Sequence, residues 1–265
     1  MPTTLSRRVL AAVMALGLLV IYVPLAVVLV NSFNSSRTFS WPPTSFTTHW
    51  WSLAAASEGA RSALRTSVLA GVGATTIALL LGTMAAFAVS RYRWFGRETV
   101  SFLLLLPIAL PGIVTGIALN NAFRVAGAAF GLLTIIIGHS TFCVVVVYNN
   151  ALARLRRLGG TLEEASMDLG AGVWQTFRHV TFPLLRSALL AGGLLAFALS
   201  FDEIIVTTFT SAPGVQTLPL WIFGNLFRPN QGPVVNVVAA ALILLSVVPV
   251  WLAQRVSGEP IGARR

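Results

Sequence analysis

Few residues in this 265-residue chain could carry out catalytic chemistry. All 18 basic residues are arginine, so no lysine is available for a P-loop or a Schiff base. The histidines His49, His139 and His179 are scattered, without the HExxH spacing of a zinc enzyme, and the single cysteine, Cys143, cannot form an internal disulfide. No G-x-S-x-G nucleophile motif occurs. We therefore predict no catalytic and no metal site, and interpret His139 as a polar packing group.

The acidic pair Asp202 and Glu203 is the main remaining candidate, because it interrupts an otherwise apolar stretch. Carboxylates in a region of low dielectric attract ammonium groups, so the pair could form a cation site on a transport path. Alternatively, it could mark a helix end whose carboxylates lie in water among lipid headgroups. The residues alone leave both interpretations open.

The composition places these residues in a membrane protein. The chain is 56% hydrophobic and only 10% charged, and its mean hydropathy is +0.82. Such a chain has too little polar surface for a soluble fold, and disorder, nucleic-acid binding and a secreted disulfide scaffold are all disfavoured. The net charge of +10 indicates either an anionic ligand or arginines kept on the cytoplasmic side, and the arginine positions distinguish the two.

Long charge-free stretches predict a single all-α domain with six membrane-spanning helices. The fifth is expected to end near Val206, followed by an irregular outer segment because prolines and glycine interrupt residues 204–227. Pro107, Pro111 and Gly112 should bend the third span, and Pro249 the sixth. The predicted spans are residues 9–30, 66–90, 99–121, 132–153, 184–206 and 234–254.

The arginine distribution predicts that both termini are cytoplasmic. Thirteen arginines fall on one side of the predicted spans and five on the other, and the richer side is expected to face the cytoplasm. We interpret the first span as uncleaved rather than as a signal peptide. The richer side holds Arg7, Arg8, Arg91, Arg93, Arg97, Arg154, Arg156, Arg157, Arg178, Arg186, Arg255, Arg264 and Arg265; the other holds Arg37, Arg61, Arg65, Arg124 and Arg228.

The cytoplasmic loop between the fourth and fifth spans has an organised pattern. Thr161 and Glu164 match a capping box, and Gly170 is placed to end the helix that the box begins. A second short helix is expected over residues 173–180, before Pro183 begins the fifth span. Two such helices would form a projection with an apolar face, which either contacts a protein partner or lies on the bilayer surface.

This loop resembles the EAA loop of the membrane subunits of binding-protein-dependent ABC importers. That motif reads Glu-Ala-Ala, three residues, Gly, nine residues, then Ile, any residue, Leu-Pro. The sequence here has Glu164-Ala165-Ser166, three residues, Gly170, nine residues, then Val180-Thr181-Phe182-Pro183. Ser166, Val180 and Phe182 depart from the motif conservatively.

The resemblance implies a type I ABC importer permease fold over essentially the whole chain. Residues 159–183 would be the coupling loop that docks into a separate ATPase dimer, which binds ATP and Mg²⁺; this chain would carry no cofactor. A homologous second permease subunit, an extracytoplasmic substrate-binding protein and a bacterial plasma membrane bilayer are the other implied partners, with no nucleic acid. The implied coupling residues are Glu164, Ala165, Ser166, Gly170, Trp174 and Pro183.

Residues 199–209, 216–222 and 233–239 resemble the second permease subunit of spermidine/putrescine importers. This implies a polyamine path, with Glu203 standing where the commonest form has a second aspartate. The expected path residues are Asp202, Glu203, Trp221, Phe223 and Phe227.

Other importers of this class move aminophosphonates, ferric ions, thiamine or sugars, so these substrates remain alternatives. An anionic substrate would require arginines along the path, and only Arg65, Arg124 and Arg228 are candidates. A passive channel and an intramembrane enzyme are the less favoured classes.

Overall fold

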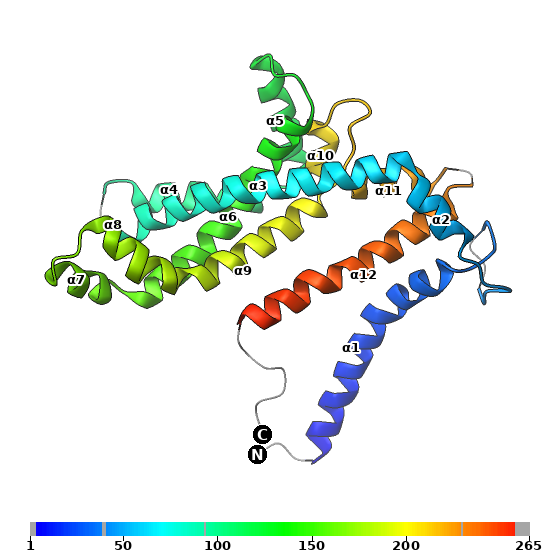
Figure 1. The fold of residues 1–265 in the computed structure, drawn as a ribbon, viewed down its shortest axis with the longest axis horizontal. Coiled ribbons are helices and arrows are strands. Elements are labelled where there is room, and N and C mark those ends of the chain that lie inside the picture. Colours follow the sequence, from blue (N-terminus) through cyan, green and yellow to red (C-terminus); the bar gives the residue numbers. More distant parts are fainter. Residues whose placement is uncertain (1–3, 39–40, 93, 229, 258–265) are drawn as a thin grey trace. The chain divides into compact units, whose positions relative to one another are not determined.

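The computed structural model describes residues 4–38, 41–92, 94–228 and 230–257, and most of these residues are helical (Figure 1). Within these residues the only β feature is an isolated bridge between Asn34 and Phe46, so the all-α prediction is confirmed. The helices are α1 (Thr4–Asn31), α2 (His49–Ala56), α3 (Glu58–Arg91), α4 (Arg97–Ala109), α5 (Gly112–Val125), α6 (Leu132–Leu158), α7 (Thr161–Asp168), α8 (Val173–Thr176), the π-helical turn η1 (Phe177–Thr181), α9 (Phe182–Phe201), α10 (Ile205–Thr210), α11 (Leu218–Leu226) and α12 (Gly232–Ser257).

The chain divides into two compact units, and the first contains α1, α2 and most of α12. After Arg8 the side chains of α1 are apolar on all sides up to Val30, and its most apolar window is unburied, as expected for a helix in lipid. The segment after α1 is held to α2 by two contacts. The Trp50 indole donates to the Asn34 carbonyl at 2.9 Å, and Phe33 stacks on Trp51 with ring centroids 5.3 Å apart.

The second unit spans residues 62–221 and has its core where α6 packs along α9 (Figure 1). Tyr148 of α6 is fully buried in this core, together with Leu155 of α6 and Leu185 of α9. The Tyr148 hydroxyl and the Ser101 hydroxyl are 2.6 Å apart and hydrogen-bond, which attaches α4 to α6. Close packing also requires Gly82 of α3, because a Cβ there would lie 2.9 Å from a backbone oxygen of α6.

The third predicted span is broken, as its prolines and glycine indicated. Helices α4 and α5 meet at an angle of 106°, so the predicted bend is confirmed. Leu110 adopts an extended conformation (ψ 142°) directly before Pro111, whose ring disfavours a helical conformation at the preceding residue. The pair is either one broken span or a re-entrant segment.

The segment after α9 is more regular than we predicted. It forms α10 and α11, so the expectation of an irregular outer segment is wrong for these residues. The first amide of α11, that of Leu218, donates to the Ser67 hydroxyl of α3 at 2.8 Å. Ser67 lies some 150 positions from Leu218 in the chain, so the residues next to α11 give no sign of this cap. The sequence therefore did not indicate that a helix begins there.

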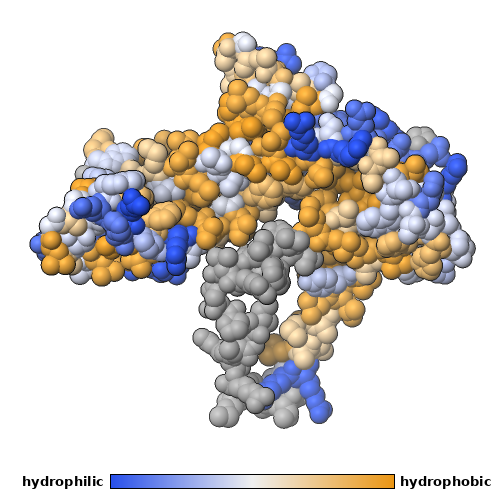
Figure 2. Space-filling model, in the orientation of Figure 1, coloured by the Kyte–Doolittle hydropathy of each residue, from blue (hydrophilic) through white to orange (hydrophobic). Residues whose placement is uncertain are grey.

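Helix length and composition identify a multi-pass membrane protein. Four described helical stretches are long and apolar enough to cross a bilayer, and the bent α4–α5 pair would make five. Helix α12 adds an apolar stretch over Gly232–Ser246, while the side chains around Pro249 lie outside the described residues. The count of six spans remains a prediction. Hydrophobic surface covers much of the helices, and hydrophilic atoms gather near α7 (Figure 2).

Candidate functional site

The cytoplasmic loop of the sequence analysis folds as α7, a glycine corner and α8. Helix α7 begins at Thr161, one residue earlier than a capping threonine would allow, so the predicted capping box is absent. Gly160 is the N-cap, its carbonyl accepts the Glu164 amide at 2.9 Å, and no side chain caps the helix. The Glu164 side chain is exposed. Because Thr161 lies inside the helix, its hydroxyl is one position too late to cap it.

Gly170 ends α7, as the sequence predicted. Its φ of +87° lies in the left-handed region, where other residues are strained. The Gly170 amide donates to the Met167 carbonyl at 2.9 Å, and the Ala171 amide donates to the Ser166 carbonyl at 3.1 Å. These two bonds satisfy carbonyls at the helix end and reverse the chain direction.

The second short helix exists but does not stop before Pro183. Gln175 caps its start by accepting the Gly172 amide at 2.9 Å, and the Ser166 and Thr176 hydroxyls hydrogen-bond at 3.0 Å between α7 and α8. The chain then passes through η1 directly into α9 and stays helical from Val173 to Phe201. Our prediction of a separate helix was wrong because a π turn changes the hydrogen-bond register ahead of Pro183, which itself has no amide hydrogen to donate.

Glu163, which the sequence analysis did not single out, attaches this loop to the spans. Arg91, at the end of α3, donates from Nη2 to Glu163 Oε1 at 3.0 Å, and its Nε lies 2.8 Å from Oε2. The Thr181 hydroxyl donates to Oε1 at 2.9 Å. Both charged side chains are about four-fifths buried, with 21% and 19% exposed. A single carboxylate thus connects α7, α3 and η1.

Three apolar side chains around the glycine corner are exposed on the surface of the protein. Leu169 is 90% exposed, Val173 78% and Trp174 68%, and these large apolar side chains form a patch of the kind that marks a protein or membrane contact. Trp174 is nevertheless fixed, because it stacks on Phe177 at 5.5 Å and Phe177 packs edge-on against Phe87 of α3 at 5.8 Å. We name Leu169, Val173 and Trp174 the apolar tip.

The acidic pair lies at a break between α9 and α10. Helix α9 ends at Phe201, so the predicted continuation of the fifth span to Val206 is wrong. Asp202 is exposed, whereas Glu203 is partly buried and accepts the Val206 amide through Oε1 at 2.8 Å. This bond satisfies a free amide in the first turn of α10, and it explains why the helix restarts there.

The predicted aromatic path residues fall in different units. Trp221 is buried, with 8% exposed, at the end of the second unit. Phe223 and Phe227 belong to the first unit and are 57% and 82% exposed. The structure therefore distinguishes a packed tryptophan from two phenylalanines that are open to lipid, substrate or another chain.

An open pocket of about 540 Å³ lies beside α10, and its charged lining residue is Arg124. Arg124 donates from Nε to the Asn120 side-chain oxygen at 2.8 Å, and its guanidinium carbon is 5.7 Å from the centre of the Phe130 ring. Asn120 is itself fixed, because its amide donates to the Phe209 carbonyl at 2.6 Å. The pocket is lined by Asn120, Arg124, Phe130, Thr208, Phe209, Ser211, Ala212, Pro213, Gly214, Val215, Gln216 and Leu220.

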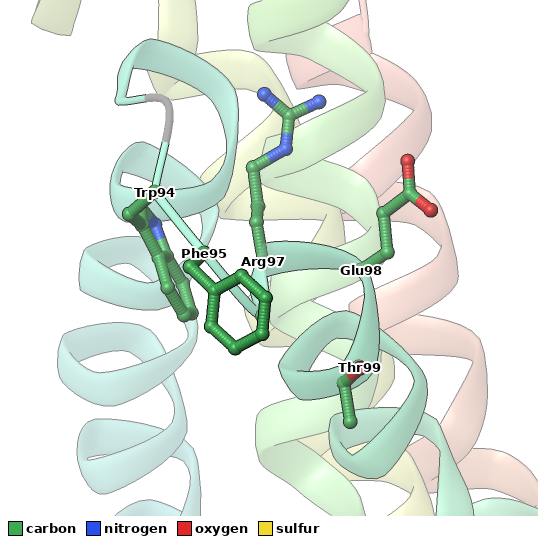
Figure 3. A pocket seen from close by; sticks show the side chains of 6 residues that line it. Trp94, Phe95, Arg97, Glu98 and Thr99 are labelled. Atoms are coloured by element: carbon green, nitrogen blue, oxygen red, sulfur yellow. The ribbon is translucent and has the colours of Figure 1, made fainter.

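A second depression, of about 400 Å³, lies at the turn between α3 and α4 (Figure 3). The Trp94 and Phe95 rings lie next to each other, while the Arg97 and Glu98 side chains extend away from them. All of its lining residues come from one short turn, Trp94 through Thr99, so no second element closes it. Such a shallow surface is a poor candidate for a substrate site. Among the described residues, no group of three or more His, Cys, Asp or Glu could hold a metal ion.

The relatives found by comparison with known proteins are permease proteins of transport systems. The chain is 34% identical over 240 residues to the spermidine/putrescine transport system permease protein PotC of Escherichia coli K12, covering 90% of each chain. It is 33% identical to the putrescine transport system permease protein PotI of the same strain, covering 87% of this chain and 84% of the relative. The putative 2-aminoethylphosphonate transport system permease protein PhnV of Salmonella choleraesuis is 30% identical, with 94% and 97% covered.

The fold also matches a solved transporter. A bacterial ABC transporter involved in the import of the acidic polysaccharide alginate has a chain that superposes with a TM-score of 0.74, covering 97% of this chain and 98% of that one at 17% identity. At that identity the match concerns the fold alone, and it is the fold of an ABC importer permease. The family model for the binding-protein-dependent transport system inner membrane component matches residues 78–258. The chain therefore belongs to the family of inner membrane components of binding-protein-dependent transport systems.

Proposed function

We propose that this chain is the permease subunit of an ATP-driven importer of polyamines such as spermidine and putrescine. The observation that carries the substrate class is the acidic pair at the α9–α10 break, in a chain 34% identical to a spermidine/putrescine permease. Asp202 is exposed, and among the described residues the hydrogen bond to the Glu203 carboxylate is accepted by Oε1, so both carboxylates can receive an ammonium group. The exposed rings of Phe223 and Phe227 remain candidates for cation–π contacts along the path, and Trp221 would support the path from its buried position.

We further propose that the apolar tip docks into a partner ATPase, which binds ATP and Mg²⁺. The tip offers a fixed aromatic anchor and exposed apolar side chains, which are the usual core of a protein interface. Glu164, Ala165 and Ser166 would lie along the docking helix, Gly170 would shape its corner, and Pro183 would lead into α9. Purified alone, the chain should hydrolyse no ATP, because it has no lysine to form a P-loop.

Family membership supports the remaining partners of this proposal. A second permease subunit would complete the path, two ATPase copies would drive it, and an extracytoplasmic binding protein would deliver the substrate. With the arginine-rich side inside, both termini would be cytoplasmic in a bacterial inner membrane. The proposal also includes six membrane spans, at residues 9–30, 66–90, 99–121, 132–153, 184–206 and 234–254.

The deciding experiment is uptake of labelled spermidine and putrescine by proteoliposomes that hold the complete complex. Asp202→Asn combined with Glu203→Gln should reduce uptake to background, because the neutral side chains cannot compensate an ammonium charge. Assembly with the ATPase, measured by co-purification, should be unchanged. Wild-type uptake by the double variant would refute the cation site.

The Arg124 pocket supports a second candidate, an anionic substrate such as an aminophosphonate. Its guanidinium is positioned by Asn120 and Phe130, and no acidic residue lines the pocket. Arg124→Gln serves as the matched control for the acidic double variant. If it abolishes transport of 2-aminoethylphosphonate while the acidic double variant does not, the second candidate replaces the first.

A further inference from the structure

A buried histidine lies directly behind the acidic break. His139 of α6 is fully buried, and both ring nitrogens are hydrogen-bonded. Nδ1 is 2.8 Å from the Ser200 hydroxyl, at the end of α9, and Nε2 is 2.8 Å from the Thr207 hydroxyl, in α10. One imidazole thus contacts the chain on both sides of Asp202 and Glu203.

For a neutral imidazole, one proton arrangement satisfies all three hydrogen bonds of this network. Thr207 donates its only hydroxyl proton to the Glu203 carbonyl at 2.8 Å, so it must accept the bond from His139 Nε2. Nε2 therefore carries the ring proton, and Nδ1 of the neutral ring accepts the Ser200 hydroxyl. The imidazole is connected through Thr207 to the backbone of the residue that carries the carboxylate.

The surroundings give α10 little freedom to move. A Cβ at Gly138 of α6 would lie 3.1 Å from Thr210, and a Cβ at Gly116 of α5 would lie 2.5 Å from the Phe209 ring. The Thr134 hydroxyl, also on α6, is 2.7 Å from the Thr210 carbonyl. Helix α10 is thus packed on both sides, and the His139–Thr207 bond is the contact of this network that reaches the Glu203 backbone.

We propose that His139 is a positioning residue for the polyamine site. Through Thr207 it fixes the Glu203 backbone, and Glu203 Oε1 accepts the Val206 amide, which leaves Oε2 to receive an ammonium group. A site held in its binding geometry avoids the entropic cost of ordering a carboxylate when the ligand arrives. This inference rests on the function proposed above.

Two substitutions separate positioning from packing. An asparagine at 139 can replace Nδ1 and keep the Ser200 bond, whereas a glutamine can reach as far as Nε2 and keep the Thr207 bond. Both replacement side chains are polar. The asparagine variant loses the bond to Thr207, and the glutamine variant loses the bond to Ser200. If His139 only fills space, thermal unfolding and transport should respond to the two changes in parallel.

Polyamine uptake by the complete complex in proteoliposomes is the test, with KM and maximal rate measured separately. We expect His139→Asn to raise the KM for spermidine about tenfold, the effect of losing one buried hydrogen bond, while the rate at saturating spermidine is kept. His139→Gln should restore the KM to near the wild-type value. The melting temperatures of the two variants should fall by similar amounts.

The outcomes are distinguishable from failure of the cation site itself. If Glu203→Gln abolishes uptake but His139→Asn leaves the KM unchanged, or if both His139 variants raise it equally, positioning is refuted and the polyamine site stands. If Glu203→Gln leaves uptake unchanged, the proposed site and this inference both fail.

Discussion

The attachment of the coupling loop by Glu163 leads to a quantitative prediction. Glu163→Gln keeps the size of the side chain but removes its charge, so the Arg91 guanidinium loses its ion pair and one of the two bonded oxygens becomes an amide group. Hydrogen bonds to a charged group contribute about 1.5–3 kcal/mol each, and Glu163 accepts one from Arg91 and one from Thr181. Both bonds end on Oε1, so glutamine can still accept them as weaker, uncharged bonds. The loss of the charge and of the Arg91 Nε contact to Oε2 should cost about 2 kcal/mol.

This loss should appear as local opening of the loop. A free energy of about 2 kcal/mol corresponds to an approximately 30-fold change in the equilibrium between the closed and open loop. Hydrogen exchange of the α7 amides, measured on the complete complex, should therefore quicken by about the same factor, while exchange in the buried part of α6 should not change. ATP-driven uptake should fall, because a loosened loop transmits less of the ATPase motion to the spans.

Glu164→Gln is the matched control, since Glu164 is the neighbouring carboxylate on the same helix but its side chain is exposed. It should leave hydrogen exchange in α7 close to the wild-type rate, whatever it does to ATPase docking. Equal exchange rates for Glu163→Gln and the wild type would show that the ion pair does not hold the loop, and would refute this reasoning.

Three further substitutions test other contacts. Gly116→Ala should lower the unfolding free energy in detergent by about 1–3 kcal/mol through overpacking, whereas Gly17→Ala, in open space on α1, should not; equal melting temperatures would contradict the close approach. Tyr148→Phe should cost about 1 kcal/mol, and adding Ser101→Ala should cost little more in a double-mutant cycle; fully additive losses would argue against the bond. Trp174→Ala should reduce ATPase co-purification by at least about fivefold, as expected for an interface anchor, without changing the melting temperature of the purified chain; undiminished co-purification would exclude the tip as the anchor.

The sequence was most informative where local chemistry decides the backbone. Pro111 disfavours a helical conformation at Leu110, and the predicted bend occurs there; Gly170 adopts a positive φ, and the predicted helix end occurs there. Long apolar stretches likewise predicted the positions of the major helices, because each must satisfy its own backbone in lipid.

Two features that the sequence did not reveal depend on partners distant in sequence. Helix α11 is capped by Ser67, and the loop is fixed by an ion pair between Glu163 and Arg91, 72 positions apart. The capping box at Thr161 failed because its pattern matches equally well when the helix begins one residue earlier. Arg91 could have been suspected, since it ends a predicted span on the side of the loop, but no spacing indicated which carboxylate it would bind.

The unbroken helical path from Val173 to Phe201 has a mechanical consequence. At about 1.5 Å per residue, this helix is roughly 40 Å long. A displacement of its end near the apolar tip should therefore also displace the acidic break at its other end. The one compliant point is η1, whose wider turns are less regular than those of an α-helix. Bending of the helix should concentrate there, and spin labels on either side of η1 should therefore record the largest change in relative angle during a transport cycle.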